Sequence, residues 1–162
     1  MMSPVNAPAT APAAIESANP AEAGGPVTSY ARAVGALVLG LGVLGLVPGV
    51  VTHYSELGLY SSGANLFGLF RTSVVSASLQ VLFGLTVLSV SGSVRQAHKA
   101  VVFTALAYLL AGLSGAGLVV NATRSDLVVN VASNWLHLAL FAVVLGGAVR
   151  ARRKHVAQLG VF

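Results

Sequence analysis

This chain contains a set of long apolar segments that carry almost no charge, and these segments limit the folds that it can adopt. The clearest runs from Asn130 to Lys154: Trp135 stands near its start, residues 138–149 are uncharged, and four cations follow within Arg150–Lys154. An aromatic residue at one end, apolar filling and a basic flank are typical of a membrane-spanning helix. Of the 162 residues, 56% are hydrophobic and only 8% are charged. A soluble domain of this length has too little interior to bury so much apolar surface, so the sequence predicts a bilayer as its solvent.

Three further apolar segments precede this one, so the sequence predicts four spans within a transmembrane domain at residues 30–150. The segment 64–90 is longer than a crossing needs, because as a helix it would extend about 40 Å against about 30 Å of hydrocarbon. We therefore expect its first turns to lie in the interface. The composition of residues 1–29 predicts a disordered Ala/Pro-rich tail, and that of residues 151–162 predicts a basic tail. The spans are expected at residues 33–51, 66–90, 100–120 and 131–149.

Four spans place the connecting segments alternately on the two sides of the membrane, and the cations are distributed unequally between these sides. One side receives Arg32, the cations of the loop 91–99 and those after the fourth span, whereas the other receives Arg71 and Arg124. Cytoplasmic loops carry an excess of Lys and Arg, so both termini and the middle loop are expected in the cytoplasm. The predicted fold is an all-α integral membrane four-helix bundle that runs up-down-up-down. The residues that we expect to anchor this topology are Arg95, Lys99, Trp135, Arg150, Arg152, Arg153 and Lys154.

Several kinds of chemistry are excluded by what the sequence lacks. The chain has no cysteine, so it can form neither a thiolate metal site nor a thiol nucleophile. Outside the first tail the acidic residues are Glu56 and Asp126, both in loops, so no pair of carboxylates is available for acid–base catalysis. The net charge of +5 does not indicate nucleic-acid binding, because the cations stand at the ends of apolar runs. We expect no enzyme activity, no catalytic residue, no metal and no cofactor.

A layer of polar side chains crosses the second and fourth spans near the predicted outer face. Ser76 and Gln80 share one face of the second helix, and Ser133 and His137 share a face of the fourth, because each pair is four residues apart. We therefore predict that Gln80 or Ser76 approaches His137 between the helices. Two interpretations stay open: an interhelical hydrogen bond worth about 0.6 kcal/mol, or a buried ligand or proton site. The predicted polar layer comprises Ser76, Gln80, Ser133, Asn134 and His137.

Four short strings carry a resemblance to a known family. GVLGLVPGV, ANLFGLF, LFGL and NVASNWLHLAL occur here in the order and spacing of the DUF4383 family, and the resemblance covers about Arg32 to Arg150. Members of that family are small four-span membrane proteins of unknown function, found mainly in high-GC bacteria. The resemblance implies the same four-span fold and a location in the bacterial cytoplasmic (inner) membrane.

The family pattern also places polar residues in the second and fourth helices. Its HNxxH element would fall on Ser76, Ala77 and Gln80, where this chain differs at all three positions. In its NxADNWLH element Ser133 replaces the acidic residue, while the matching positions are Asn130, Asn134, Trp135 and His137. The resemblance implies a cluster of three histidines and one aspartate, of which only His137 is present here. We therefore expect this divergent member to lack any ionic function of that cluster.

The expected function follows from glycine-rich helix faces without a catalytic set. We expect a non-enzymatic integral membrane protein with a structural or accessory role in a larger membrane complex. The alternative is a small-molecule or ion binding or transport protein that uses the polar layer between the second and fourth helices. The expected partners are the lipid bilayer and either a second copy of the chain or another membrane protein, with no nucleic acid.

Overall fold

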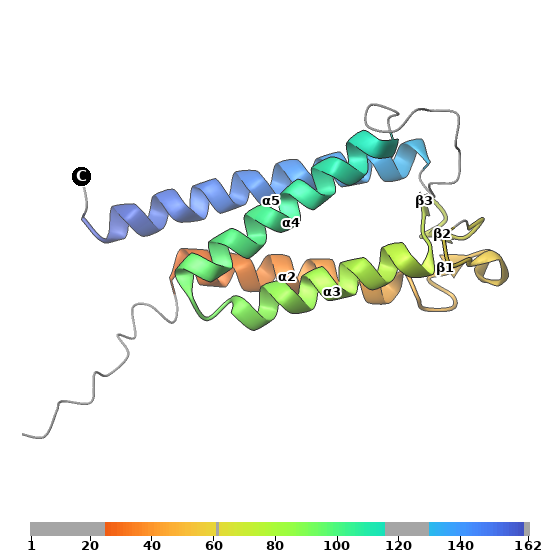
Figure 1. Ribbon diagram of the computed structural model, residues 1–162, viewed down its shortest axis with the longest axis horizontal. Helices are drawn as coiled ribbons and strands as arrows, with labels where there is room; N and C mark the ends of the chain where they lie inside the picture. Colours follow the sequence, from red (N-terminus) through yellow and green to blue (C-terminus); the bar gives the residue numbers. More distant parts are fainter. Residues whose placement is uncertain (1–24, 61, 116–129, 161–162) are drawn as a thin grey trace, which may run out of the picture.

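The computed structural model describes residues 25–60, 62–115 and 130–160 (Figure 1). In this part of the chain four helices run in alternating directions: α2 (Pro26–Leu44), α3 (Val74–Val90), α4 (Val94–Gly115) and α5 (Val131–Gln158). The predicted up-down-up-down arrangement of four helices is thereby confirmed. The following parts of the sequence predictions lie outside the described residues: the tail up to residue 24, the end of the third span at 116–120, Arg124 and Asp126.

The helices form two layers, with α2 packed along α3 and α4 packed along α5 (Figure 1). Glycine makes the first of these pairs close. A Cβ on Gly42 would lie 2.6 Å from the backbone nitrogen of Val81, and a Cβ on Gly84 would meet the backbone of Leu39. In lipid, helix association depends on such close contact, because the surrounding acyl chains are as apolar as the side chains. The α2–α3 pair therefore depends on the absence of side chains at these two positions.

Small apolar side chains fill the space between the two layers. Val38, Val101 and Val144 are fully buried there, on α2, α4 and α5 respectively. Tyr30 adds a polar link, because its hydroxyl donates to the carbonyl of Val143 at 2.9 Å and lies 3.2 Å from that of Val144. The first turns of α2 are therefore joined to the middle of α5 across the bundle.

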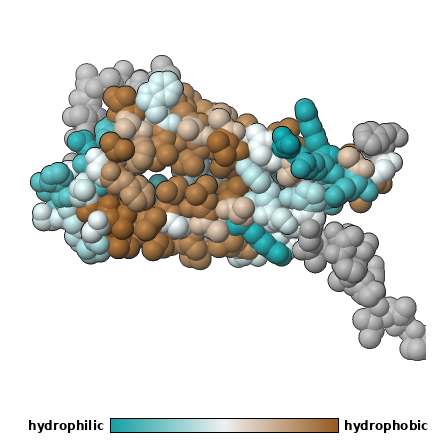
Figure 2. All heavy atoms as spheres, turned by 180° about the vertical axis from the view of Figure 1, so that it is seen from behind, coloured by the Kyte–Doolittle hydropathy of each residue, from teal (hydrophilic) through white to brown (hydrophobic). Residues whose placement is uncertain are grey.

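Three of the helices, α2, α4 and α5, are long and apolar enough to cross a membrane, and α3 is a shorter apolar helix of 17 residues. Seventeen residues is near the lower limit for a crossing, which needs roughly 17–25 residues. The surface agrees with a bilayer location. On the face that Figure 2 shows, a wide apolar belt crosses the middle of the helices, with polar side chains gathered at both ends.

The region before α3 differs from the sequence prediction. The second span was expected to begin at residue 66, but this region contains a small antiparallel sheet of three strands, β1 (Val51–Thr52), β2 (Asn65–Leu66) and β3 (Phe70–Arg71). A tight turn joins β2 to β3, with positive φ angles at Phe67 (53°) and Gly68 (73°). Glycine adopts such angles without strain. The sheet caps the end of the bundle opposite to the start of α2 (Figure 1).

Helix α3 begins eight residues later than expected because of a local cap. The backbone NH of Ser76 donates to the hydroxyl of Ser73 at 3.2 Å, and the backbone NH of Ser73 donates to the hydroxyl of Ser76 at 3.0 Å. This reciprocal pair is a capping box, which satisfies two NH groups that a helix start leaves free. The polar pair Ser73 and Ser76 therefore marks the start of the helix.

The other helices also differ in extent from the expected spans. Helix α2 begins at Pro26, within the stretch predicted as tail, because proline is favourable in the first turn of a helix. It ends at Leu44 rather than near residue 51, ahead of Pro48, which cannot continue the helical hydrogen bonds. Helix α5 continues to Gln158, so most of the stretch predicted as a basic tail is helical.

Candidate functional site

The start of α5 is fixed to the small sheet by two polar side chains. Asn130 caps the helix, because its side-chain oxygen accepts from the backbone NH of Ser133 at 2.8 Å. The same side chain donates through Nδ2 to the carbonyl of Leu69 at 2.9 Å. The hydroxyl of Ser133 donates to the carbonyl of Arg71 at 3.3 Å. Through these bonds the loop and strand before α3 hold the beginning of α5.

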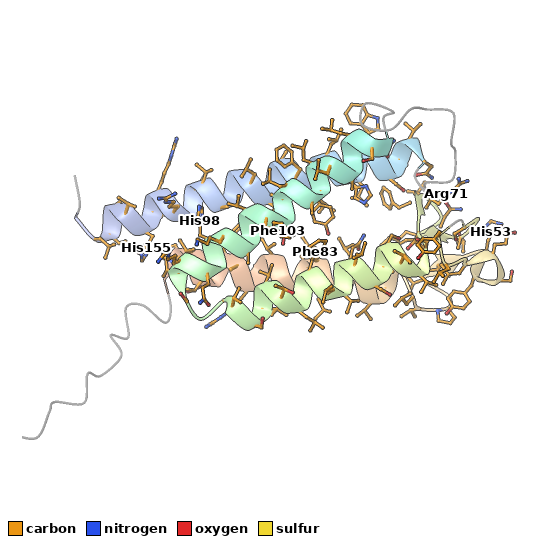
Figure 3. All side chains as sticks on the ribbon, in the orientation of Figure 1. His53, Arg71, Phe83, His98, Phe103 and His155 are labelled. Carbon is orange, nitrogen blue, oxygen red and sulfur yellow. The ribbon has the colours of Figure 1, made fainter. Side chains whose placement is uncertain are left out.

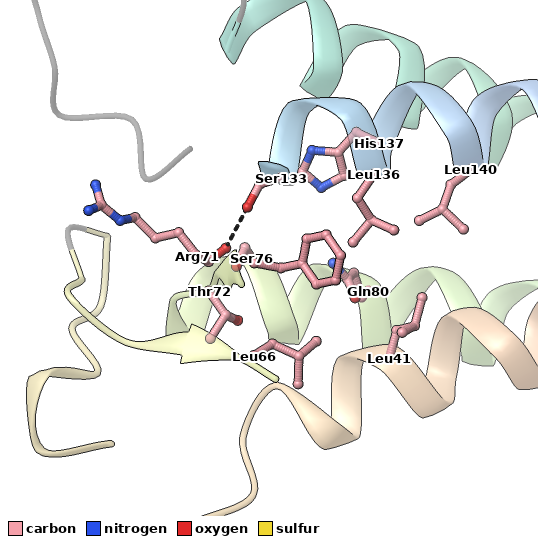
Figure 4. Close-up of a pocket in the computed structure, with 11 residues that line it drawn as sticks. Leu41, Leu66, Arg71, Thr72, Ser76, Gln80, Ser133, Leu136, His137 and Leu140 are labelled. Carbon is pink, nitrogen blue, oxygen red and sulfur yellow. Dashed lines mark hydrogen bonds between the residues drawn. The ribbon is translucent and has the colours of Figure 1, made fainter. Parts of the chain in front are cut away.

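A small cavity lies below this junction, between α3 and α5 (Figure 4). Its volume, counted as the space open to the centres of water molecules, is about 40 Å³. A single water needs roughly 10–15 Å³ by this measure, so the cavity has room for a few waters or one small ion. Pockets for organic ligands are larger, about 300–1,000 Å³. The lining residues are Leu41, Leu66, Phe70, Arg71, Thr72, Ser76, Gln80, Ser133, Leu136, His137 and Leu140.

The structure brings four of the five predicted polar-layer residues to this cavity. Ser76 and Gln80 reach it from α3, and Ser133 and His137 reach it from α5 (Figure 4). Asn134 is not among the lining residues. The proximity that helical spacing suggested is therefore present, while a binding role for these residues stays a prediction.

Within the described residues no hydrogen bond joins Ser76 or Gln80 to His137. The hydroxyl of Ser76 is engaged in the capping box and also donates to the carbonyl of Ser73 at 3.0 Å. A direct interhelical hydrogen bond from these residues to His137, one of the two interpretations from sequence, is therefore absent from the described residues. Instead, the polar groups of the two helices face each other across the cavity.

His137 has a neighbour that helical spacing did not predict. Its ring stacks on that of Tyr108 from α4, with 5.8 Å between the ring centroids and 28° between the planes. Three polar atoms in this region are buried without a hydrogen-bond partner among the described residues: Nδ1 of His137, the hydroxyl of Tyr108 and Oδ1 of Asn134. Buried polar groups in proteins are almost always paired with protein or ordered water. The sequence did offer one signal for Tyr108: it is a tyrosine within a predicted span, and its buried hydroxyl requires a hydrogen-bond partner.

The side chains of the polar layer are neutral apart from the imidazole, and the guanidinium of Arg71, the other ionisable lining residue, points away from the cavity (Figure 4). No group of three or more His, Cys, Asp or Glu side chains comes together in the part of the chain that the structure describes. Divalent metal sites in proteins take three or four such ligands, and His137 supplies one. Hydroxyls, amides and one imidazole can hold water or a small polar molecule by hydrogen bonds. They do not form the acid–base pair that hydrolysis or proton abstraction requires.

The predicted topology anchors lie at the two ends of the bundle. Trp135 is 68% exposed in the second turn of α5, on the side of the sheet. The remaining anchors are at the opposite end, in the first turns of α4 or towards the end of α5. These cationic anchors are Arg95, Lys99, Arg150, Arg152, Arg153 and Lys154.

Three helices of spanning length and an apolar belt define the class of this molecule: it is a multi-pass membrane protein. Within that class the chain belongs to a family, because the model of DUF4383, a domain of unknown function, matches residues 29–149. The resemblance seen in the sequence is thereby confirmed. No curated protein and no solved structure matches the chain.

Proposed function

We propose that this protein is a non-enzymatic component of the bacterial cytoplasmic membrane that serves as a structural or accessory subunit of a larger membrane complex. The observation that carries this proposal is the presence of small residues on helix faces that the bundle leaves open. A Cβ on Gly40 or Gly146 would have nothing within 4 Å. Gly42 and Gly84 differ in this respect, because atoms of the neighbouring helix in the same chain already occupy the space where their Cβ would lie.

Each open glycine completes a small-xxx-small step on an outward face. Ala36 precedes Gly40 by four residues on α2, and Ala142 precedes Gly146 by four residues on α5. Ala36, Ala142 and Gly146 are exposed. In lipid, such steps let a second helix approach closely, and van der Waals contact then favours association. The two steps therefore suit contact with another membrane helix, from a second copy or from another protein.

The absence of enzymatic activity is proposed from the chemistry of the described residues. The cavity between α3 and α5 is too small for an organic substrate, and its side chains include no carboxylate. A catalytic site needs a nucleophile with an adjacent base, or an acid–base pair. The cavity has serine hydroxyls and one imidazole, but the hydroxyls of Ser76 and Ser133 donate to backbone carbonyls, so in the described residues neither is paired with His137 as its base.

The threading is proposed from the distribution of cations. Arg32, Arg95, Lys99 and the cations of α5 lie at the end of the bundle that holds the start of α2, whereas Arg71 lies at the sheet (Figure 3). The positive-inside rule then puts the start of α2, the α3–α4 turn and the end of α5 in the cytoplasm. The sheet and Trp135 would face the outside.

Cross-linking in native membranes tests the proposed accessory role. We expect a defined protein adduct that also survives purification in mild detergent. A strictly monomeric species, with no adduct from the outward faces of α2 and α5, would contradict the proposal.

A second candidate function is binding of a small polar molecule or ion at the cavity. The polar lining favours it, because Ser76, Gln80 and Ser133 border the cavity together with His137, whose Nδ1 has no hydrogen-bond partner among the described residues. His137→Ala should then alter any binding or growth phenotype, whereas Leu136→Ala, which changes the same cavity by an apolar residue, should have a smaller effect. Equal effects of the two substitutions would argue against this function.

A further inference from the structure

A second concave site lies at the opposite end of the bundle from the polar cavity. It is an open groove of about 540 Å³, lined by His98 of α4 and by Val149, Arg152, Arg153 and Val156 of α5. The four residues of α5 follow the spacing i, i+3, i+4 and i+7, so they lie on one face of that helix. We call this site the basic groove. The neighbourhood of His98 is visible in Figure 3.

The basic groove has cations but no counter-ion among the described residues. Arg152 and Arg153 line it, and further cations stand beside them along α5 and in the first turns of α4. The one acidic residue in the described part of the chain is Glu56, in the short helix η1 (Tyr54–Glu56) on the side of the sheet. Cations gathered without an anion repel one another, so the groove attracts an anion from outside the chain.

The groove also contains an imidazole, that of His98. Nδ1 of His98 is buried and has no hydrogen-bond partner within the described residues. His98 lines the groove beside Arg152 and Arg153, so an anion seated there would meet side chains from both α4 and α5. Guanidinium groups recognise phosphate oxygens through two parallel hydrogen bonds, which lysine cannot reproduce.

The other groove residues indicate what carries the anion. Val149 is 43% exposed and Val156 is 38% exposed, so both offer apolar contact beside the arginines. The polar side chains at this end border the apolar belt, at the level where lipid headgroups meet hydrocarbon (Figure 2). Basic pockets between transmembrane helices are known to hold anionic lipid headgroups. We propose that the basic groove binds the phosphodiester of an anionic membrane lipid, with Arg152, Arg153 and His98 on the phosphate and the two valines on the adjoining apolar part.

The test uses the full chain, purified in detergent and exchanged into bilayers of phosphatidylethanolamine with and without phosphatidylglycerol. Native mass spectrometry then counts the phosphatidylglycerol that stays bound. Arg152→Gln with Arg153→Gln should reduce this retention at least about tenfold, because hydrogen bonds to charged groups are the strong ones in such sites. Arg150→Gln with Lys154→Gln is the matched control, since it removes the same charge from the same helix outside the groove lining.

A second double variant guards against faulty membrane insertion. Arg152→Lys with Arg153→Lys keeps every positive charge, so threading is preserved, but the planar guanidinium fork is lost. Retained lipid should fall in this variant while the amount of folded protein stays normal. Equal losses in the groove and control variants, or no loss in either, would overturn the proposal. Occupation of the groove by inorganic phosphate, with no preference for phosphatidylglycerol, would overturn the assignment to a lipid.

Discussion

The side-chain amide of Asn130 donates to the backbone carbonyl of Leu69 at 2.9 Å, and so ties the N-cap of α5 to the turn between β2 and β3. The two residues are 61 positions apart in the chain. With its other side-chain atom, Asn130 caps α5 by accepting from the NH of Ser133. One asparagine therefore both starts the last helix and attaches it to the sheet, which closes the end of the bundle above the polar cavity.

Asn130→Ala should loosen this junction. It removes the helix cap, and loss of a cap costs about 1 kcal/mol of stability. It also removes the hydrogen bond to Leu69. We expect faster amide hydrogen exchange in the first turn of α5 and in the β2–β3 turn. Asn130→Asp separates the two effects, because a carboxylate still accepts from Ser133 but cannot donate to Leu69. In that variant exchange should rise in the turn alone. Unchanged exchange in both variants would show that Asn130 does not hold the junction.

The close contact of α2 with α3 should depend on Gly42. Gly42→Ala should destabilise the protein by about 1–3 kcal/mol, because the new Cβ would press on the backbone of α3 at Val81 and Ala77. Gly40→Ala is the matched control on the same helix, since nothing lies within 4 Å of its Cβ position. That substitution should be neutral or stabilise by up to about 1 kcal/mol, because alanine is the better helix former. Thermal unfolding in detergent measures both. Similar effects of the two substitutions would contradict the packing of α2 on α3.

Helices α2 and α5 should be energetically coupled through Tyr30 and Gly147. A Cβ on Gly147 would overlap the hydroxyl end of the Tyr30 ring. Gly147→Ala should therefore be destabilising with Tyr30 in place and much less so together with Tyr30→Ala. The interaction energy from this double-mutant cycle should fall within about 0.5–3 kcal/mol, the range for residues in contact. Additive effects would mean that the two residues do not touch.

Single cysteines can test the proposed threading, because the natural chain has none. Ser93→Cys lies in the exposed turn between α3 and α4, and Tyr60→Cys lies in the exposed loop next to the sheet. In intact cells a membrane-impermeant maleimide should label the cysteine at position 60 only. After permeabilisation it should label both variants. Labelling of position 93 in intact cells would reverse the proposed orientation.

Sequence reasoning was most successful where the bilayer makes the constraint simple. Long uncharged segments must be helices in lipid, because every backbone polar group has to be paired within the segment. The four helices and their alternating directions followed from this requirement. The positions of Ser76, Gln80, Ser133 and His137 near one another followed from helical spacing and depth. Both arguments need only the rise and period of a helix.

The sheet and the caps were not predictable in the same way. Each strand contains two residues, which is too short for an alternating pattern to appear in the sequence. From the sequence Ser76 was assigned only to a polar helix face, whereas in the structure it also forms a capping box with Ser73. The stacking of His137 on Tyr108 depends on how α4 and α5 rotate against each other. Packing of the whole bundle sets that rotation, and no local pattern records it.

The proposed accessory role requires that the outward step of small residues on α5 contacts another membrane helix. The direct measurement places a benzophenone on Val143→Cys, which is 64% exposed beside this step, and irradiates native membranes. Phe103→Cys, 63% exposed on α4, is the control. We predict a discrete protein adduct from position 143, its loss when Gly146→Leu is added, and no such adduct from position 103. Only monomer and lipid adducts from position 143, or the same protein adducts from both positions, would contradict the accessory role.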